Sequence, residues 1–202
     1  MTHTAQVSTL IFLVAGLAGC ATQAPQATPA SAPVAAPVAA APSAAPAAEV
    51  AKELYVVLPD DGRIYAFGDT KNYFDFLTHG EVTLTRTRIG EGPGGKTLVF
   101  GITADDVKAN KPSLGEKVML SGLPAAPEFY GEVFKGGRFY VFGDLKDIKD
   151  FTAFGEVPYS YTDIGAGPKG ETLVYVMNSA SYKLGKPEVR VERFKALRVA
   201  GK

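Results

Sequence analysis

This chain of 202 residues matches itself at a fixed offset of 75 residues, which restricts the folds that it can adopt. Residues 53–112 align with residues 128–187 without a gap, and 26 of the 60 aligned positions are identical. The longest matched blocks include Gly80-Glu81-Val82 with Gly155-Glu156-Val157, and Thr97-Leu98-Val99 with Thr172-Leu173-Val174. Shared composition does not produce a match of this length, so the pattern indicates a tandem duplication.

Each copy begins with the pattern of a β-hairpin. A first strand is expected over residues 54–58 and again over 129–134, and a second over 63–67 and 138–142. Glycine-containing turns separate the two strands in both copies, as hairpins require.

A helix of about ten residues is expected next in each copy. Asp69 and Asp144 stand where an N-cap is needed, and Gly80 and Gly155 stand where a helix ends. Between them, apolar residues recur at helical spacing. They are Tyr73, Phe76 and Leu77 in the first copy, and Ile148, Phe151 and Phe154 in the second.

The rest of each copy has the pattern of further strands. Residues 82–86 alternate and are expected to form a long hairpin with a strand beginning at Thr97, across the loop Gly90–Gly95. That loop lacks the Gly-Lys-Ser/Thr continuation of a phosphate-binding loop, so a turn is the better interpretation. Residues 104–109 favour a helical turn, with weaker support at 178–183, and strands are expected at Glu116–Leu120 and Val189–Val199.

These patterns predict an α+β fold made of two tandem, homologous ββαββ repeats, each with an antiparallel sheet and one main helix. We place repeat 1 at residues 51–124 and repeat 2 at residues 125–202. The copies are expected to pack as a pseudo-symmetric pair.

Charge is distributed very unevenly along the chain. Residues 1–48 contain no Lys, Arg, Asp or Glu, so all 21 basic and 21 acidic residues lie from Glu49 onward. The net charge is zero and no basic stripe is present. Nucleic acid is therefore not an expected partner, because its binding depends on a positive field.

The single cysteine, Cys20, excludes an internal disulfide and any multi-cysteine metal site. It closes the run Leu17-Ala18-Gly19-Cys20 after the apolar stretch 10–17, and this run resembles the lipobox of bacterial lipoproteins. The resemblance implies that residues 1–19 are a signal peptide and that Cys20 carries the lipid, palmitate included, which anchors the protein in a membrane. The apolar stretch is too short to span a bilayer. An ordinary secretory signal is the alternative.

Residues 20–50 are expected to join the lipid anchor to the repeats. From Ala21 to about Ala48 the chain is nearly all Ala and Pro with some Gln, Ser and Thr, which predicts a disordered stalk with a reach of roughly 85 Å. Lipoproteins retained in a Gram-negative inner membrane typically carry Asp after the lipidated cysteine, whereas this chain has Ala21. The resemblance therefore implies an outer-membrane lipoprotein whose body faces the periplasm.

Six polar or aromatic residues shared by the two copies are candidate ligand-binding residues. They are Arg63, Tyr65, Glu81, Arg138, Tyr140 and Glu156. Arg63 and Glu81 have the chemistry to bind a carboxylate or a metal ion, although a salt bridge is the simpler interpretation.

Evidence for catalysis is weak in this sequence. His79 is the only histidine after Cys20, and its counterpart is Phe154, so no triad of nucleophile and base is predicted. Asp75 with Glu81 is the one pair considered for acid-base work. No catalytic residue, metal ion or cofactor is predicted.

The function that the sequence favours is a membrane-anchored, non-catalytic binding or envelope-interaction module. Its expected partners are the membrane, through Cys20, and an envelope protein or the cell wall. The alternative is an enzyme or accessory subunit that acts on a cell-wall or carbohydrate substrate. A third interpretation is a purely structural tether.

Overall fold

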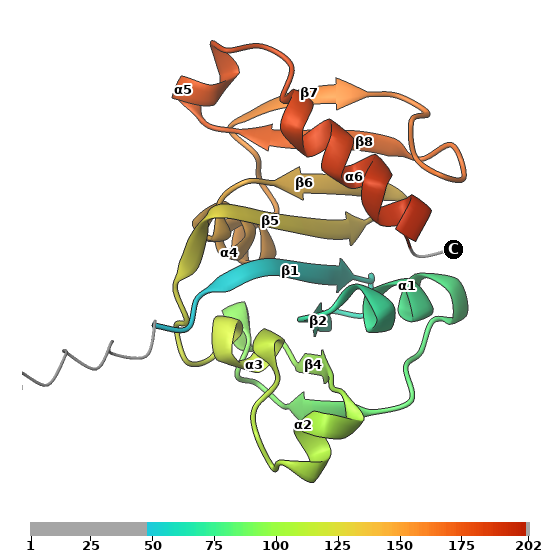
Figure 1. Ribbon diagram of the computed structural model, residues 1–202, viewed down its shortest axis with the longest axis vertical. Helices are drawn as coiled ribbons and strands as arrows, with labels where there is room; N and C mark the ends of the chain where they lie inside the picture. The colour runs from blue at the N-terminus through green and yellow to red at the C-terminus, as the bar shows by residue number, and fades with distance from the viewer. Residues whose placement is uncertain (1–47, 201–202) are drawn as a thin grey trace, which may run out of the picture. The chain divides into compact units, whose positions relative to one another are not determined.

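A single mixed sheet of eight strands forms the centre of the computed structural model, which describes residues 48–200 (Figure 1). The strand order is β3-β4-β2-β1-β5-β6-β8-β7. The strands are β1 (Ala51–Leu58), β2 (Ile64–Phe67), β3 (Thr85–Arg88), β4 (Leu98–Gly101), β5 (Ala125–Lys135), β6 (Arg138–Phe142), β7 (Tyr159–Asp163) and β8 (Thr172–Met177). The predicted signal peptide, the lipidated Cys20 and the stalk lie outside the described residues, apart from the stalk's last positions.

Six α-helices and one short 3-10 helix accompany the sheet within residues 48–200. They are α1 (Thr70–His79), η1 (Pro93–Gly95), α2 (Ala104–Lys108), α3 (Leu114–Met119), α4 (Leu145–Phe154), α5 (Ser179–Tyr182) and α6 (Glu188–Ala200). In this part of the chain no helix has both the length and the apolar character needed to cross a membrane.

The elements of residues 51–124, here called the first half, recur in the same succession in residues 125–200, the second half. Each half contains two strands, a ten-residue helix, two more strands and two further helices. The predicted hairpins are present, since β1 pairs with β2, β3 with β4, and β5 with β6, all antiparallel.

The two halves meet where β1 and β5 run parallel, with Val56 beside Val133. Further parallel pairs join β2 to β4 and β6 to β8. In the sheet, β4 lies on one side of β2, whereas β8 lies on the opposite side of β6. Because crossovers between parallel strands are right-handed in nearly all proteins, these two crossovers must pass on opposite faces of the sheet.

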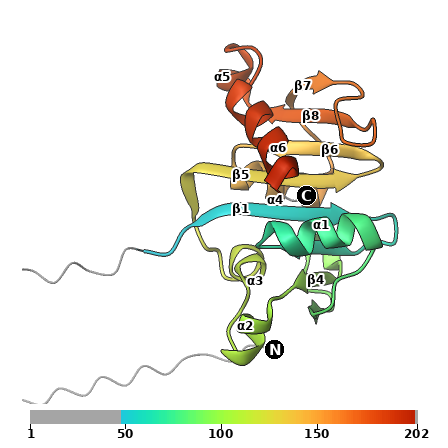
Figure 2. The same cartoon turned by 45° about the vertical axis from the view of Figure 1, so that its right-hand side comes forward.

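The helices accordingly cover both faces of the sheet. One face packs against α3 and α4 through Val118, Ile148 and Phe151. The other packs against α1 and α6 through Tyr73 and Phe194. Figure 2 shows α1 and α6 in front of the sheet and α4 behind it. Each face therefore combines one helix of the first half with one of the second.

The ends of α1 and α4 follow the sequence prediction. Asp69 accepts a hydrogen bond from the backbone N–H of Asn72, and Asp144 accepts one from Lys146, so both aspartates act as N-caps. Gly80 and Gly155 end the helices in the left-handed conformation, with φ of 77° and 76°. Glycine adopts this conformation without steric cost.

The expectation that each copy has an antiparallel sheet of its own and one main helix is wrong. The halves share one mixed sheet, and each half carries three α-helices. Alternating apolar residues predict a strand but not which strands pair with it. The pairing of β4 with β2 could therefore not be predicted from the local sequence.

The two strands expected at Glu116–Leu120 and Val189–Val199 are also wrong, because these segments belong to α3 and α6. A capping box starts α3, in which Ser113 and Glu116 bond each other's backbone N–H. In α6, the buried residues Val191 and Phe194 are three positions apart, which is helical spacing.

We expect Gly68→Ala to lower the free energy of unfolding by about 1–3 kcal/mol, because overpacking forces neighbours to move. A Cβ added at Gly68 would lie 2.5 Å from the Cβ of Leu114 in α3. The equivalent residue, Gly143, is the matched control, since its added Cβ would be 3.5 Å from the nearest atom, the Cδ of Arg190. Urea unfolding of the two variants measures the difference, and equal losses would contradict this packing.

Candidate functional site

A shallow hollow of about 410 Å³ lies on the sheet in the first half of the protein. Side chains from β2, β3, β4 and the adjoining loops line it, and we call this set the first threonine face. It consists of Arg63, Tyr65, Thr85, Thr87, Ile89, Thr97 and Val99. The register places Tyr65 beside Val99 and Val99 beside Thr87, so the three lie in one row across the sheet.

Two contacts fix the aromatic end of this face. The ring of Tyr65 packs on Phe76 of α1 with a centroid separation of 4.5 Å. Arg63 donates from Nη1 to the Tyr65 hydroxyl at 3.4 Å, and its Nε lies 3.6 Å from a carboxylate oxygen of Asp61. The hydrogen bond to Tyr65 raises the pKa of Arg63.

The second half carries the equivalent residues in the equivalent register. Tyr140 lies beside Val174, and Val174 lies beside Thr162. Tyr140 packs on Phe151 of α4 at 4.5 Å, as Tyr65 packs on Phe76. The second threonine face consists of Arg138, Tyr140, Ser160, Thr162, Ile164, Thr172 and Val174. Because α4 and α1 cover opposite faces of the sheet, the two threonine faces also point in opposite directions.

Residue identity between the halves is concentrated on the threonine faces. Six of the seven positions are identical, and the seventh exchanges Thr85 for Ser160. On the reverse side of the same strands, one of six positions is identical. The six pairs are Ile64/Phe139, Ala66/Val141, Arg86/Tyr161, Arg88/Asp163, Leu98/Leu173 and Phe100/Tyr175.

Packing alone does not account for this pattern. Ile89 and Ile164 are each 84% exposed, and Thr87 and Thr162 are exposed as well. A buried position normally tolerates fewer exchanges than an exposed one, because interiors are close-packed. Here the agreement includes the exposed pairs Arg63/Arg138, Thr87/Thr162 and Ile89/Ile164.

The six sequence-predicted ligand residues do not form one site. Arg63 and Tyr65 lie together on the first threonine face, and Arg138 and Tyr140 belong to the second. Glu81 lines a separate hollow of about 440 Å³ at the end of α1, with Asp75 and His79. The sixth residue, Glu156, is exposed just after α4.

The threonines and isoleucines of the faces were missed by sequence reasoning. Their signal was present in the aligned copies, because positions 85, 87 and 89 agree in character with their counterparts whereas 86 and 88 do not. Period-two agreement marks one side of a strand.

A third cavity, a pocket of about 280 Å³, lies between α1, the loop before β8 and the ends of β5 and β6. Phe74, Phe134 and Phe139 form its apolar wall, and Arg198 of α6 borders it. The residues equivalent to Phe74 and Phe134 are Lys149 and Pro59. The apolar wall of this pocket is therefore not repeated at the equivalent place on the other face of the sheet.

Arg198 is held by the fully buried carboxylate Glu132 on β5. Its Nη1 and Nη2 donate to the two carboxylate oxygens at 3.0 and 2.7 Å. The hydroxyls of Tyr73 and Tyr130 donate to the same carboxylate at 3.1 and 2.5 Å. Burial raises the pKa of both tyrosines well above the ordinary value, so they stay protonated donors. Burial lowers the pKa of Arg198, but the hydrogen bond and charge of Glu132 more than offset this and raise it.

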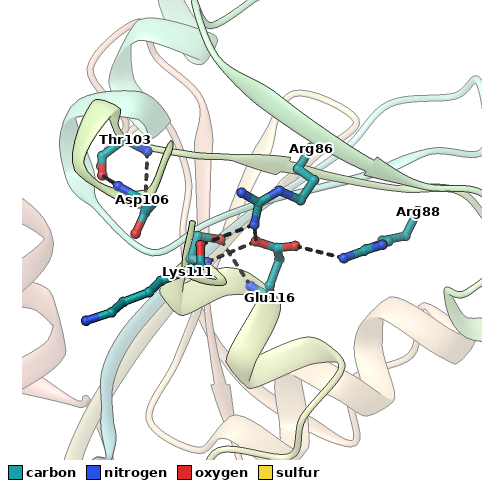
Figure 3. Close-up of polar contacts among 7 residues, drawn as sticks. Arg86, Arg88, Thr103, Asp106, Lys111 and Glu116 are labelled. Carbon is teal, nitrogen blue, oxygen red and sulfur yellow. Dashed lines mark hydrogen bonds and ion pairs between the residues drawn. The ribbon is translucent and has the colours of Figure 1, made fainter. Parts of the chain in front are cut away.

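A second buried carboxylate, Glu116 of α3, holds the edge strand β3 against α3 through ion pairs (Figure 3). Arg86 donates to Glu116 Oε2 at 2.6 Å, and Arg88 lies 3.6 Å from Oε1. The backbone N–H of Ser113 donates to Oε2 at 2.9 Å. Val191 stands at the equivalent position in the second half. Glu116 is thus surrounded by hydrogen bonds and ion pairs within the protein. This is the arrangement of a structural ion cluster and not of a carboxylate that exchanges a proton with a substrate.

The described residues contain no group of three or more His, Cys, Asp or Glu side chains placed to hold a metal ion. Asp75 accepts a hydrogen bond from Lys71 at 2.6 Å.

Searches of protein-family models, curated proteins and solved structures found no match to this chain. The threonine faces are therefore interpreted from their own geometry.

We expect Arg198→Met to lower the free energy of unfolding by about 3–5 kcal/mol, because it leaves Glu132 buried without a counter-charge. Arg193→Met, on the same helix, is the control. Arg193 pairs with Glu53 at 3.3 Å and is 37% exposed, so its loss should cost about 1 kcal/mol or less. Chemical denaturation compares the two, and a small effect at Arg198 would refute the role given to Glu132.

Proposed function

We propose that this protein is a lipid-anchored envelope protein whose body is a non-catalytic binding module made of two copies of one duplicated unit. The observation that carries the proposal is the agreement of the two threonine faces at exposed positions. Two copies that agree at exposed positions on one side of the strands, while five of six positions on the reverse side differ, are under a common demand at that surface. Binding is such a demand, because the outward side chains contribute little to the core.

Binding accounts for the faces better than catalysis does. Each face offers hydroxyls, a tyrosine and one arginine, but no carboxylate or histidine for proton transfer. His79 lies in a different hollow, and Phe154 takes its place in the second half. A catalytic group at this position would therefore serve one copy alone.

The anchor in this proposal is Cys20. Its lipid chains would hold the protein in the outer membrane with the body in the periplasm, and the Ala/Pro-rich stalk would separate the body from the lipid surface. Both threonine faces would then be accessible to an envelope component.

We expect Cys20→Ala to abolish membrane attachment, because the thiol that accepts the lipid is lost. Fractionation of cells and phase partition in detergent should move the variant from the membrane fraction to the soluble fraction. Mass spectrometry of the wild-type N-terminal peptide should show acyl chains on Cys20. An unmodified wild-type peptide that still sediments with membranes would contradict the lipoprotein proposal.

We expect photo-crosslinking groups placed at Thr87 or Thr162 in the full chain to give reproducible adducts in intact cells. Groups at Lys108 and Lys183 serve as matched controls, since these exposed lysines are also 75 residues apart but lie away from the faces. The adducts should be the same from Thr87 and Thr162 and should weaken with Cys20→Ala. Equal labelling from all four positions would refute the threonine faces as binding surfaces.

A further inference from the structure

The ligand of the threonine faces can be inferred from their chemistry, and this inference rests on the proposed binding function. Arginine is the one charged side chain in each set of seven residues, and in the first half Asp61 lies beside it, whereas Gly136 takes that place in the second half. Each set also contains three hydroxyl side chains from Thr or Ser, and an exposed isoleucine. This composition complements a ligand that is rich in hydroxyls and carries negative charge.

The arrangement of these groups suits sugar rings. Tyr65 and Tyr140 are half-buried and are held against Phe76 and Phe151, so each ring is fixed before a ligand arrives. Neighbouring threonine hydroxyls both donate and accept hydrogen bonds, as sugar hydroxyls require. Arginine pairs with carboxylates through two parallel hydrogen bonds, which a sugar acid offers.

The placement of the faces indicates a repeating ligand. They lie toward opposite ends of the sheet and point in opposite directions, so one small molecule cannot reach both. A polymer presents the same unit many times, so one chain long enough to pass round the sheet can engage both faces. We propose that each threonine face binds a unit of an acidic polysaccharide, with the sugar carboxylate on Arg63 or Arg138.

The test uses the full chain purified in detergent and oligomers of alginate, a polymer of sugar acids, with the neutral glucan pullulan for comparison. Isothermal titration should show two sites for short alginate oligomers, the weaker one at Arg63 because Asp61 lies beside it, and little binding of pullulan. R63Q and R138Q should each remove one site. The double variant should bind at least about tenfold more weakly, because a charged hydrogen bond is lost at each site.

The control is the double variant K108Q/K183Q, which removes two equivalent, exposed positive charges away from the faces. It should keep wild-type affinity within about twofold, whereas general charge attraction would weaken both double variants alike. T87V/T162V tests the hydroxyls without changing charge or strand preference, and should weaken binding severalfold.

The glycan inference is overturned if alginate does not bind, if pullulan binds equally well, or if K108Q/K183Q weakens binding as much as R63Q/R138Q. Its failure is distinguishable from that of the proposed function. Crosslinked adducts from Thr87 and Thr162 that contain a protein, with no alginate binding, would leave the binding module standing with a different ligand. Absence of both adducts and alginate binding would remove both proposals.

Discussion

The parallel pairing of β1 with β5 determines where every other element of the protein lies. It joins the two halves through the backbone at the centre of the sheet, with partners from Ala51 to Leu58. From this pair the strands of the two halves extend toward opposite edges of the sheet. The equivalent helices α1 and α4 therefore lie on opposite faces of the sheet. Neither half encloses a core alone, because α1 and α6 share one face while α3 and α4 share the other.

This arrangement explains why the buried charges differ between the halves while the exposed faces agree. Glu132 and Arg198 bond where α6 of the second half meets α1 of the first, and Val57 and Leu123 stand at the equivalent positions. A buried carboxylate is tolerated only with its counter-charge and hydrogen bonds, so such a pair must arise together. The two faces of the shared sheet therefore carry different buried ion pairs. The two threonine faces contain no buried charge that would need a counter-charge.

Much of the local structure could be predicted from the sequence. The hairpins, the two ten-residue helices and their caps at Asp69 and Asp144 follow from alternation, helical spacing and capping chemistry. The errors fell at α3 and α6, where short runs containing valine resemble strands. Their helical state depends on the Ser113 capping box and on the sheet surface that they cover. Such a surface exists only in the folded protein.

The candidate site divides in the same way. Arg63, Tyr65 and their counterparts were predicted as ligand residues because they recur at the offset of 75, but Glu81 recurs as well and lies elsewhere. Only the strand register shows that Thr87 and Val99 join Tyr65 in one row.

The repeated order of elements follows from local sequence, because hydrogen-bonding caps, turns and apolar spacing act over a few residues. The tertiary structure alone decided that the halves share one sheet and expose their equivalent surfaces on opposite sides. Strand order and the direction of crossovers depend on contacts between residues far apart in the chain.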